Sequence, residues 1–199
     1  MLLPKRNPKE KKYIMEIVRH ISISTFRKTL SVMFFALVMP IAANSFFYLP
    51  FTPVPVTLQV LTVLLSAMIL GFPLAFYSQL AYIGMGFMGL GVFAGFKNAY
   101  IAFAGPTAGY ILGFAAASLV TGYLLQKKNR GPLFSLAAGL FCIYFFGSLH
   151  LMLYTGQAFF NTFRLGIAPF LIPDALKLML AANIYKAIKG EGDEKNNYK

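Results

Sequence analysis

Acidic residues are scarce in this sequence. Only six Asp and Glu stand against 18 Lys and Arg, and Asp174 is the only acid between Glu16 and Glu191. A pair of carboxylates within the apolar body of the chain is therefore excluded. The single cysteine, Cys142, excludes a disulfide framework and a Cys-x-x-Cys site. Two histidines, His20 and His150, are too few for a histidine metal site.

Catalytic and nucleotide-binding motifs are absent as well. The sequence contains no Walker A loop, no Gly-x-Ser-x-Gly and no His-Glu-x-x-His. We therefore expect a protein that neither hydrolyses ATP nor acts as an enzyme. One catalytic alternative stays open, an intramembrane enzyme that uses Asp174 and His150 as acid and base, which requires these two side chains to lie close together.

Hydrophobic residues dominate what is present. They make up 58% of the 199 residues, only 12% are charged, and the mean hydropathy is +0.66, far from the composition of soluble domains. The length fits one bundle of six transmembrane helices, because a span needs about 20 residues. We predict an all-α membrane protein with spans at about 31–48, 57–71, 74–92, 107–125, 133–154 and from about 172 onward. Pro40 is expected to kink the first span.

The basic residues flank these apolar runs. Eight lie in the first 28 positions, three at 127–130 and four in the last 14, which predicts that both termini face the cytoplasm and argues against nucleic-acid binding. We predict a basic cytoplasmic tail at 1–28 with a short interfacial helix near 14–21, a six-helix membrane domain at 29–189 and a cytoplasmic C-terminal tail at 190–199. A signal peptide is the competing interpretation of the first apolar run, but no clear cleavage site follows it.

Three connections are predicted to meet at the outer side. The first, at 49–56, holds three prolines and is expected to be extended and to fold over the bundle, either as a lid or as a tight connector. The second carries Lys97 and Asn98, and the third, a polar loop at 155–164, carries Arg164. Four glycines at the end of the third span are expected to allow close helix packing there: Gly84, Gly86, Gly89 and Gly91.

An acid and an amine stand at the start of the last span. Pro173 suits a first helical turn, and Asp174 and Lys177, three residues apart, then share one helix face. An ionisable residue within the membrane is a candidate functional residue. The pair is either a structural clamp between helices or an acceptor and a donor for a polar ligand. With Lys97, Arg164 and an aromatic wall, this site suits a small molecule with a polar head, an apolar body and an acidic tail.

Three blocks of this sequence resemble the signature blocks of the BioY family of biotin transporters. They are FTPVPVTLQ at 51–59, GPTAGY at 105–110 followed by Gly113 and Phe114, and Gly166 with Pro169-Phe170 and Asp174-x-x-Lys177. The resemblance runs from about 36 to 187. BioY proteins are the substrate-binding S components of energy-coupling factor transporters.

The resemblance implies biotin uptake across a bacterial cytoplasmic membrane, with the 49–56 connection closing over the ligand. It implies binding roles for Asp174 and Lys177, with Gln59, Tyr110 and either Lys97 or Asn98 nearby. It also implies a T component and two ATP-binding-cassette ATPases as partners. An Ala-x-x-x-Ala pattern typical of S components is broken here, because Pro40 follows Ala36. An S component for another small vitamin is the alternative.

Overall fold

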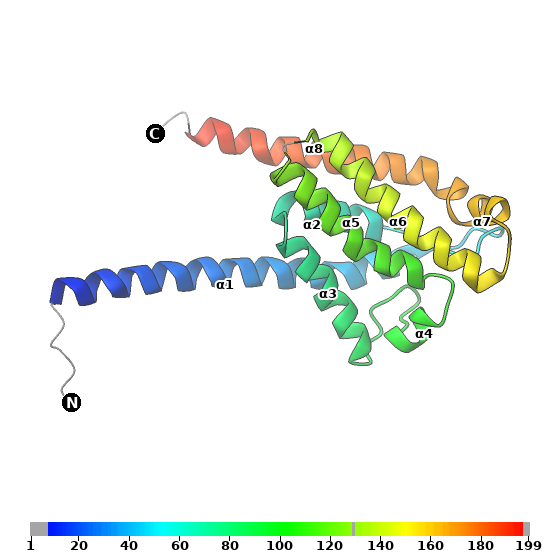
Figure 1. Ribbon diagram of the computed structural model, residues 1–199, viewed down its shortest axis with the longest axis horizontal. Helices are drawn as coiled ribbons and strands as arrows, with labels where there is room; N and C mark the ends of the chain where they lie inside the picture. The colour runs from blue at the N-terminus through cyan, green and yellow to red at the C-terminus, as the bar shows by residue number, and fades with distance from the viewer. Residues whose placement is uncertain (1–7, 129, 197–199) are drawn as a thin grey trace.

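The computed structural model describes the backbone of residues 8–128 and 130–196, and the side chains of residues 23–128 and 130–189. In this part of the chain the fold is all-α apart from two short strands (Figure 1). The helices are α1 (Pro8–Asn44), α2 (Gln59–Leu70), α3 (Leu74–Phe87), α4 (Ala99–Phe103), α5 (Ala108–Gln126), α6 (Pro132–Thr155), α7 (Phe159–Gly166), the 3-10 helix η1 (Ala168–Phe170) and α8 (Leu171–Asn196). The strands are β1 (Phe46–Phe47) and β2 (Val56–Thr57).

Four helical stretches are long and apolar enough to cross a membrane: Ile23–Asn44, Ala108–Gln126, Pro132–Thr155 and Phe159–Lys189. The helices α2 and α3 are shorter, with 12 and 14 residues. The chain is therefore a multi-pass all-α membrane protein. The predicted fourth and fifth spans agree with α5 and α6 to within a residue at either end, because loops with Gly105-Pro106 and Gly131-Pro132 delimit them.

The first helix differs from the prediction. A short interfacial helix followed by a separate span was expected, whereas α1 runs unbroken from Pro8 to Asn44, with Pro40 inside it. No Gly or Pro occurs between Lys9 and Met39, so nothing in the local sequence ends the helix once it has started. The first seven residues of the expected tail lie outside the described residues, and α8 continues to Asn196, into the expected C-terminal tail.

Close helix packing occurs between α5 and α6, and it depends on glycine. A Cβ on Gly109 would overlap the Phe146 carbonyl, and a Cβ on Gly113 would lie 2.9 Å from the Cα of Ile143. The two helix backbones can approach this closely only where side chains are missing. The sequence prediction placed close helix packing at 84–91, where the structure shows close contacts of another kind. A Cβ on Gly84 meets no atom within 4 Å, whereas a Cβ on Gly86 would overlap the Phe93 ring and a Cβ on Gly91 would lie 2.5 Å from the Phe96 carbonyl oxygen. Both partners belong to the loop after α3, which ends at Phe87, and not to a neighbouring helix.

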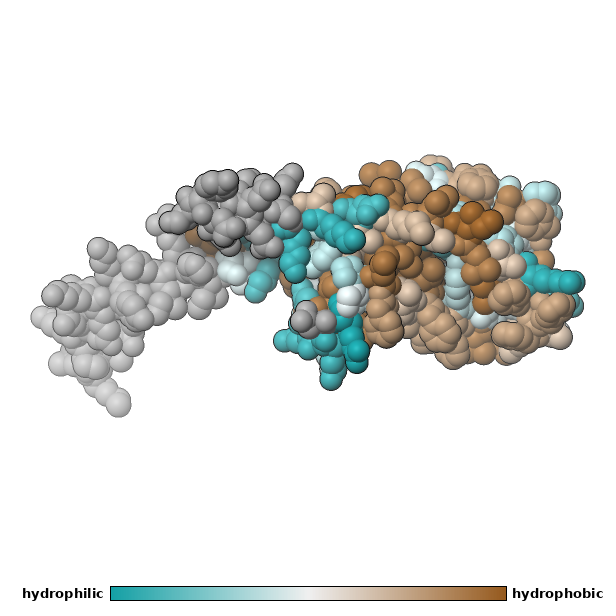
Figure 2. Space-filling view, turned by 90° about the horizontal axis from the view of Figure 1, so that it is seen from above, coloured by the Kyte–Doolittle hydropathy of each residue, from teal (hydrophilic) through white to brown (hydrophobic). Residues whose placement is uncertain are grey.

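The connections gather at one end of the bundle, as predicted. In Figure 1 the free ends of α1 and α8 extend to the left, whereas α4 and α7 lie at the right. At the other end of α5, the α5–α6 connection exposes Lys127, Lys128 and Arg130. Figure 2 shows hydrophobic residues over much of the bundle on the face that it presents, with hydrophilic residues concentrated toward the side from which α1 extends.

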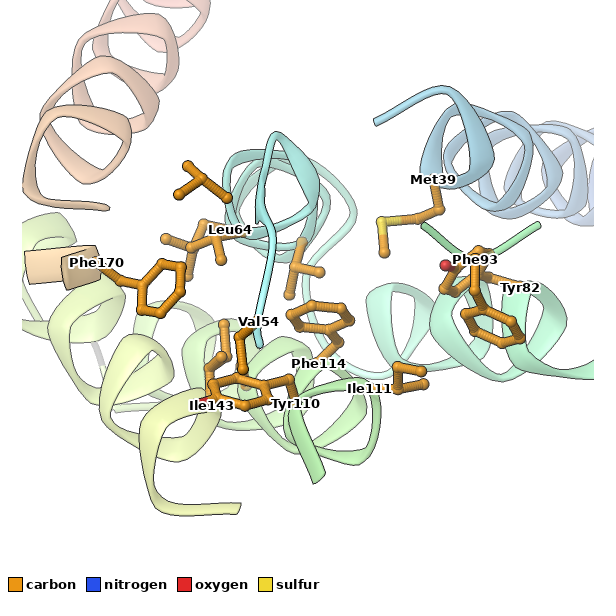
Figure 3. Packing of buried hydrophobic residues seen from close by; sticks show 14 of the residues in the cluster. Met39, Val54, Leu64, Tyr82, Phe93, Tyr110, Ile111, Phe114, Ile143 and Phe170 are labelled. Atoms are coloured by element: carbon orange, nitrogen blue, oxygen red, sulfur yellow. The ribbon is translucent and has the colours of Figure 1, made fainter. Parts of the chain in front are cut away.

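The proline-rich connection folds back over the bundle, as predicted. Its two ends pair as antiparallel strands, with Phe46 opposite Thr57 and Phe47 opposite Val56. Between them, Thr52 and Val54 are 7% and 5% exposed. We call the segment 48–55 the cover segment, because Val54 lies over the interior of the bundle beside Tyr110 and Ile143 (Figure 3).

Candidate functional site

A cavity opens beneath the cover segment. The centre of a water-sized sphere can move through about 50 Å³ of it, several times the roughly 10–15 Å³ that one buried water requires. Its polar lining residues are Thr57, Gln59, Lys97, Thr107, Tyr110, Tyr144, Asp174 and Lys177. Its apolar lining residues are Val54, Pro55, Val60, Phe93, Ala94, Ala102, Ile111, Phe114, Ile143 and Phe170. Five of the seven predicted site residues therefore border one hollow.

The acid and the amine form a buried ion pair on its wall. The Nζ of Lys177 donates to Asp174 Oδ1 at 2.7 Å, and the exposed fractions of the two side chains are 11% and 4%. The helix α8 begins at Leu171, so Asp174 lies in its first turn, where the helix dipole favours negative charge. This start agrees with the prediction based on Pro173. The hydroxyl of Tyr144 donates to the other carboxylate oxygen at 2.9 Å.

Tyr110 enters the cavity from α5. Its hydroxyl donates to the carbonyl of Gly166 at 2.7 Å, and the residue is 7% exposed. Two glycines make room for it, because a Cβ on Gly147 would overlap the ring and a Cβ on Gly166 would lie 2.5 Å from the hydroxyl oxygen. The ring is thus held between α6 and the end of α7, with its position fixed by neighbours that lack side chains.

Gln59 is the first residue of α2 and is held at both ends of its amide. Its Nε2 donates to the Tyr82 hydroxyl at 3.0 Å, and its Oε1 accepts from Thr57 Oγ1 at 3.2 Å. Tyr82 in turn donates to the carbonyl of Val92 at 3.3 Å. Such a chain of buried hydrogen bonds fixes the amide at the cavity wall.

Lys97 reaches the cavity from a tight turn. The backbones of Phe93 and Lys97 bond to each other in both directions, at 3.0 and 3.2 Å. Between them Phe96 adopts a positive φ of 55°, and its N–H donates to Asn44 Oδ1 at 2.9 Å. The C-terminal end of α1 therefore anchors the turn that presents Lys97.

Two predicted site residues lie outside the cavity lining. Asn98 caps α4, where its Oδ1 accepts from the N–H of Ile101 at 3.1 Å. Arg164 is exposed on α7, and its guanidinium lies 4.5 Å from the ring centre of Phe160. The binding roles of Asn98 and Arg164 stay predictions.

His150 stands apart from Asp174: its Nε2 lies 3.0 Å from the carbonyl of Gly105. The acid–base pair of Asp174 with His150 is therefore not formed.

Sequence reasoning missed Tyr144, the second hydrogen-bond partner of Asp174. It stands in an apolar run, where a tyrosine is indistinguishable from a packing residue, and only the packing of α6 against α8 gives it a partner. One signal was available in the sequence, since a buried Tyr hydroxyl needs a hydrogen-bond partner.

The helix α7 was also missed, because 155–164 was interpreted as a loop. Among the described residues no group of three His, Cys, Asp or Glu could hold a metal ion.

The cavity combines two chemical characters. Its charged and phenolic groups are the carboxylate and ammonium from α8 and the hydroxyls of Tyr144 and Tyr110. Its apolar walls include Val54, Phe114, Ile143 and Phe170 (Figure 3). Pockets that bind small molecules are typically apolar with a few placed polar groups. The arrangement can orient a ligand but presents no nucleophile beside a base, so it is suited to binding.

Comparisons with known proteins agree with this geometry. The model of the BioY family matches residues 13–193. A probable biotin transporter BioY of Pyrococcus horikoshii is 40% identical over 138 residues, covering 69% of this chain and 82% of its own. The biotin transporter BioY of Thermotoga maritima is 38% identical over 151 residues, covering 75% and 89%. The crystal structure of the S-component for biotin from an ECF-type ABC transporter superimposes with a TM-score of 0.77 at 19% identity, covering 84% and 93%, which shows a shared fold. The chain belongs to the BioY family.

Proposed function

We propose that this protein takes up biotin, which it binds from the outer side of the membrane in the cavity beneath the cover segment. The observation that carries the proposal is the buried Asp174–Lys177 pair on the wall of that cavity, in a chain of the BioY family. A charged pair within an apolar bundle costs desolvation energy. A ligand that uses both groups gives a reason for their presence.

Biotin matches the cavity group by group. Its ureido ring has two N–H donors and a carbonyl acceptor, its thiophane ring is apolar, and its tail ends in a carboxylate. The carboxylate of Asp174 is suited to accept from the ureido N–H groups and Lys177 to donate to the ureido oxygen. Tyr110 and Gln59 border the same space, and Lys97 supplies a cation for the tail. The cover segment acts as a lid in this proposal, since two of its residues, Val54 and Pro55, border the cavity.

The arrangement of the chain supports an outward-facing site. The basic tail, the exposed Lys127–Arg130 connection and the C-terminus hold 15 of the 18 basic residues, which favours the cytoplasmic side for both termini. The helices α1, α2, α3, α5, α6 and α8 then make six crossings of the cytoplasmic membrane, and the cavity lies toward its outer side. A nitroxide or thiol label at each connection tests this orientation in vesicles.

A T component and two ATPases energise the uptake. No ATPase motif occurs in this sequence, so the proposal assigns ATP hydrolysis to separate subunits. Ala36 is fully buried, and Pro40 is partly exposed, so we expect a partner to contact other residues of the bundle than Ala36. Uptake of labelled biotin by cells with and without these subunits tests the dependence: equal accumulation would reject it.

Saturable binding of biotin to the purified protein is the first expected result. Isothermal calorimetry in detergent should show one site per chain, and excess thiamine or riboflavin should leave it unoccupied. If one of those vitamins displaces biotin, the site belongs to a different vitamin. A flat calorimetric trace with folded protein would end the proposal.

Replacing Lys97 with methionine should weaken biotin binding about tenfold or more, because a charge-assisted hydrogen bond contributes about 1.5–3 kcal/mol. Biotin amide, which lacks the carboxylate charge, should bind the variant and the wild type equally. Lys128→Met is the matched control, because it removes an exposed cation that follows the end of α5 away from the cavity. An equal loss for biotin and its amide would contradict this role. Arg164→Met in the same binding measurement tests the separate prediction that Arg164 contributes to biotin binding.

A further inference from the structure

The cover segment is held at its tip by one side chain. Thr52 Oγ1 donates to the carbonyl of Leu165 at 2.6 Å. Among the described residues, this is the only hydrogen bond from 48–55 to another part of the chain. The hydroxyl also accepts from the N–H of Val54 at 3.2 Å. The hydroxyl thus joins the cover segment to α7, and Thr52 is not among the residues that line the cavity.

Prolines on both sides of this contact limit which backbone groups need a partner. Val54 lies between Pro53 and Pro55, so it is the only residue of 53–55 with a backbone N–H, and Thr52 satisfies it. On the other side, the carbonyl of Leu165 would in a continuing helix accept from residue 169, but residue 169 is proline. The Leu165 carbonyl is therefore left open at the end of α7, where Thr52 reaches it.

The neighbouring carbonyl, that of Gly166, accepts a hydrogen bond from Tyr110, which lines the cavity. Phe170 donates its N–H to Ile167 in the 3-10 turn, so the Gly166 carbonyl is likewise open, and it accepts from Tyr110. Two successive carbonyls of α7, those of Leu165 and Gly166, thus fix the positions of the cover segment and of Tyr110 relative to each other. The chain then enters α8, which begins one turn before Asp174.

We propose that Thr52 is a positioning residue that latches the cover segment to the end of α7, and that this latch slows ligand escape from the cavity. The inference rests on the proposed function for its ligand. The latch itself concerns the mobility of the lid and can be tested without any ligand. It acts through Val54, which borders the cavity, and through the closed position of 48–55.

Thr52→Val keeps the shape of the side chain and removes the donor. We expect labelled biotin to dissociate about tenfold faster, the effect of losing one buried hydrogen bond, with a smaller change in the association rate. Thr52→Ser should behave as the wild type. Thr121→Val is the matched control, since Thr121 is buried and also donates to a distant carbonyl, that of Ser135, at 3.1 Å. A wild-type dissociation rate in Thr52→Val would overturn the latch.

A spin label separates the latch from the identity of the ligand. Phe51, which is 58% exposed, is changed to cysteine in a Cys142→Ser background and labelled with a nitroxide. Adding Thr52→Val should raise the label's mobility in spectra of the unliganded protein. Pro169→Ala returns a competing N–H to the Leu165 carbonyl, so it should raise the mobility of the label although Thr52 is intact. This variant replaces Thr52→Val in the test if Thr52→Val does not fold. Unchanged mobility in folded variants would refute the latch. Absent biotin binding with a mobile lid would refute only the proposed function.

Discussion

Replacing Lys177 with methionine should destabilise the protein by about 3–5 kcal/mol, which is the usual cost of leaving one member of a buried ion pair alone. Asp174 is 2% exposed, and without Lys177 its remaining side-chain donor in the described structure is the Tyr144 hydroxyl. Unfolding of the purified protein in mixed detergent and SDS micelles measures the change. Lys97→Met is the control, because Lys97 borders the same cavity without an ion-pair partner among the described residues.

A double variant separates stability from ligand binding. Asp174→Asn alone should weaken biotin binding by about 1–3 kcal/mol, the cost of an unpaired buried contact. Asp174→Asn combined with Lys177→Met removes both charges, so most of the lost stability should return while biotin binding stays weak. If the double variant binds biotin as tightly as the wild type, the pair serves only as part of a structural clamp in which Asp174 of α8 accepts from Tyr144 of α6, and it has no role in recognition.

Replacing Gly109 with leucine should prevent α5 from packing on α6. Even a Cβ there would overlap the Phe146 carbonyl and the Cβ of His150, and these belong to the backbone and the root of a side chain on α6, which cannot move aside alone. Gly109→Ala should cost about 1–3 kcal/mol, and leucine more, to the point that little folded protein is recovered. Elution as a single species in detergent and the unfolding midpoint measure both effects.

Gly84→Leu provides the comparison for this prediction. A Cβ on Gly84 meets no atom within 4 Å, and the residue lies within helix α3, where leucine has a better helix propensity than glycine. We expect it to keep the wild-type unfolding midpoint. Equal losses in Gly84→Leu and Gly109→Leu would mean that glycine matters for insertion or flexibility in general, and would contradict a specific role at the α5–α6 contact.

Those glycines also show how far the sequence could predict the fold. Small residues at short spacings indicate close approach, but Gly109 and Gly113 look the same in the sequence as Gly84 and Gly91. Which set faces a helix depends on where the neighbouring helix lies. Long apolar runs with Gly-Pro boundaries predicted α5 and α6 well, whereas the continuity of α1 was missed because charged residues at its start were taken to mark a separate helix.

Residues of the candidate site could be predicted where their residue type is rare in the apolar part of the sequence. A lone acid three residues from a lysine is conspicuous in an apolar chain, and Asp174 and Lys177 were predicted as candidate site residues for that reason. Tyr144 and Thr52 were missed, because tyrosine and threonine are common and their partners lie 30 and 113 residues away in the chain. Only tertiary structure reveals such pairings.

The shortness of α2 has a consequence for how a ligand loses its hydration. Twelve helical residues rise about 18 Å, whereas the hydrocarbon layer is about 30 Å thick. In the proposed six-crossing topology, the extended chain on the N-terminal side of α2 therefore makes up part of the depth. Strand pairing and the prolines at 53 and 55 leave this stretch few bare amide groups, as burial away from water demands. In the proposed topology, in which α2 crosses the membrane, the cavity lies below the phosphate plane, and a ligand that binds there exchanges its bulk water for contacts with protein.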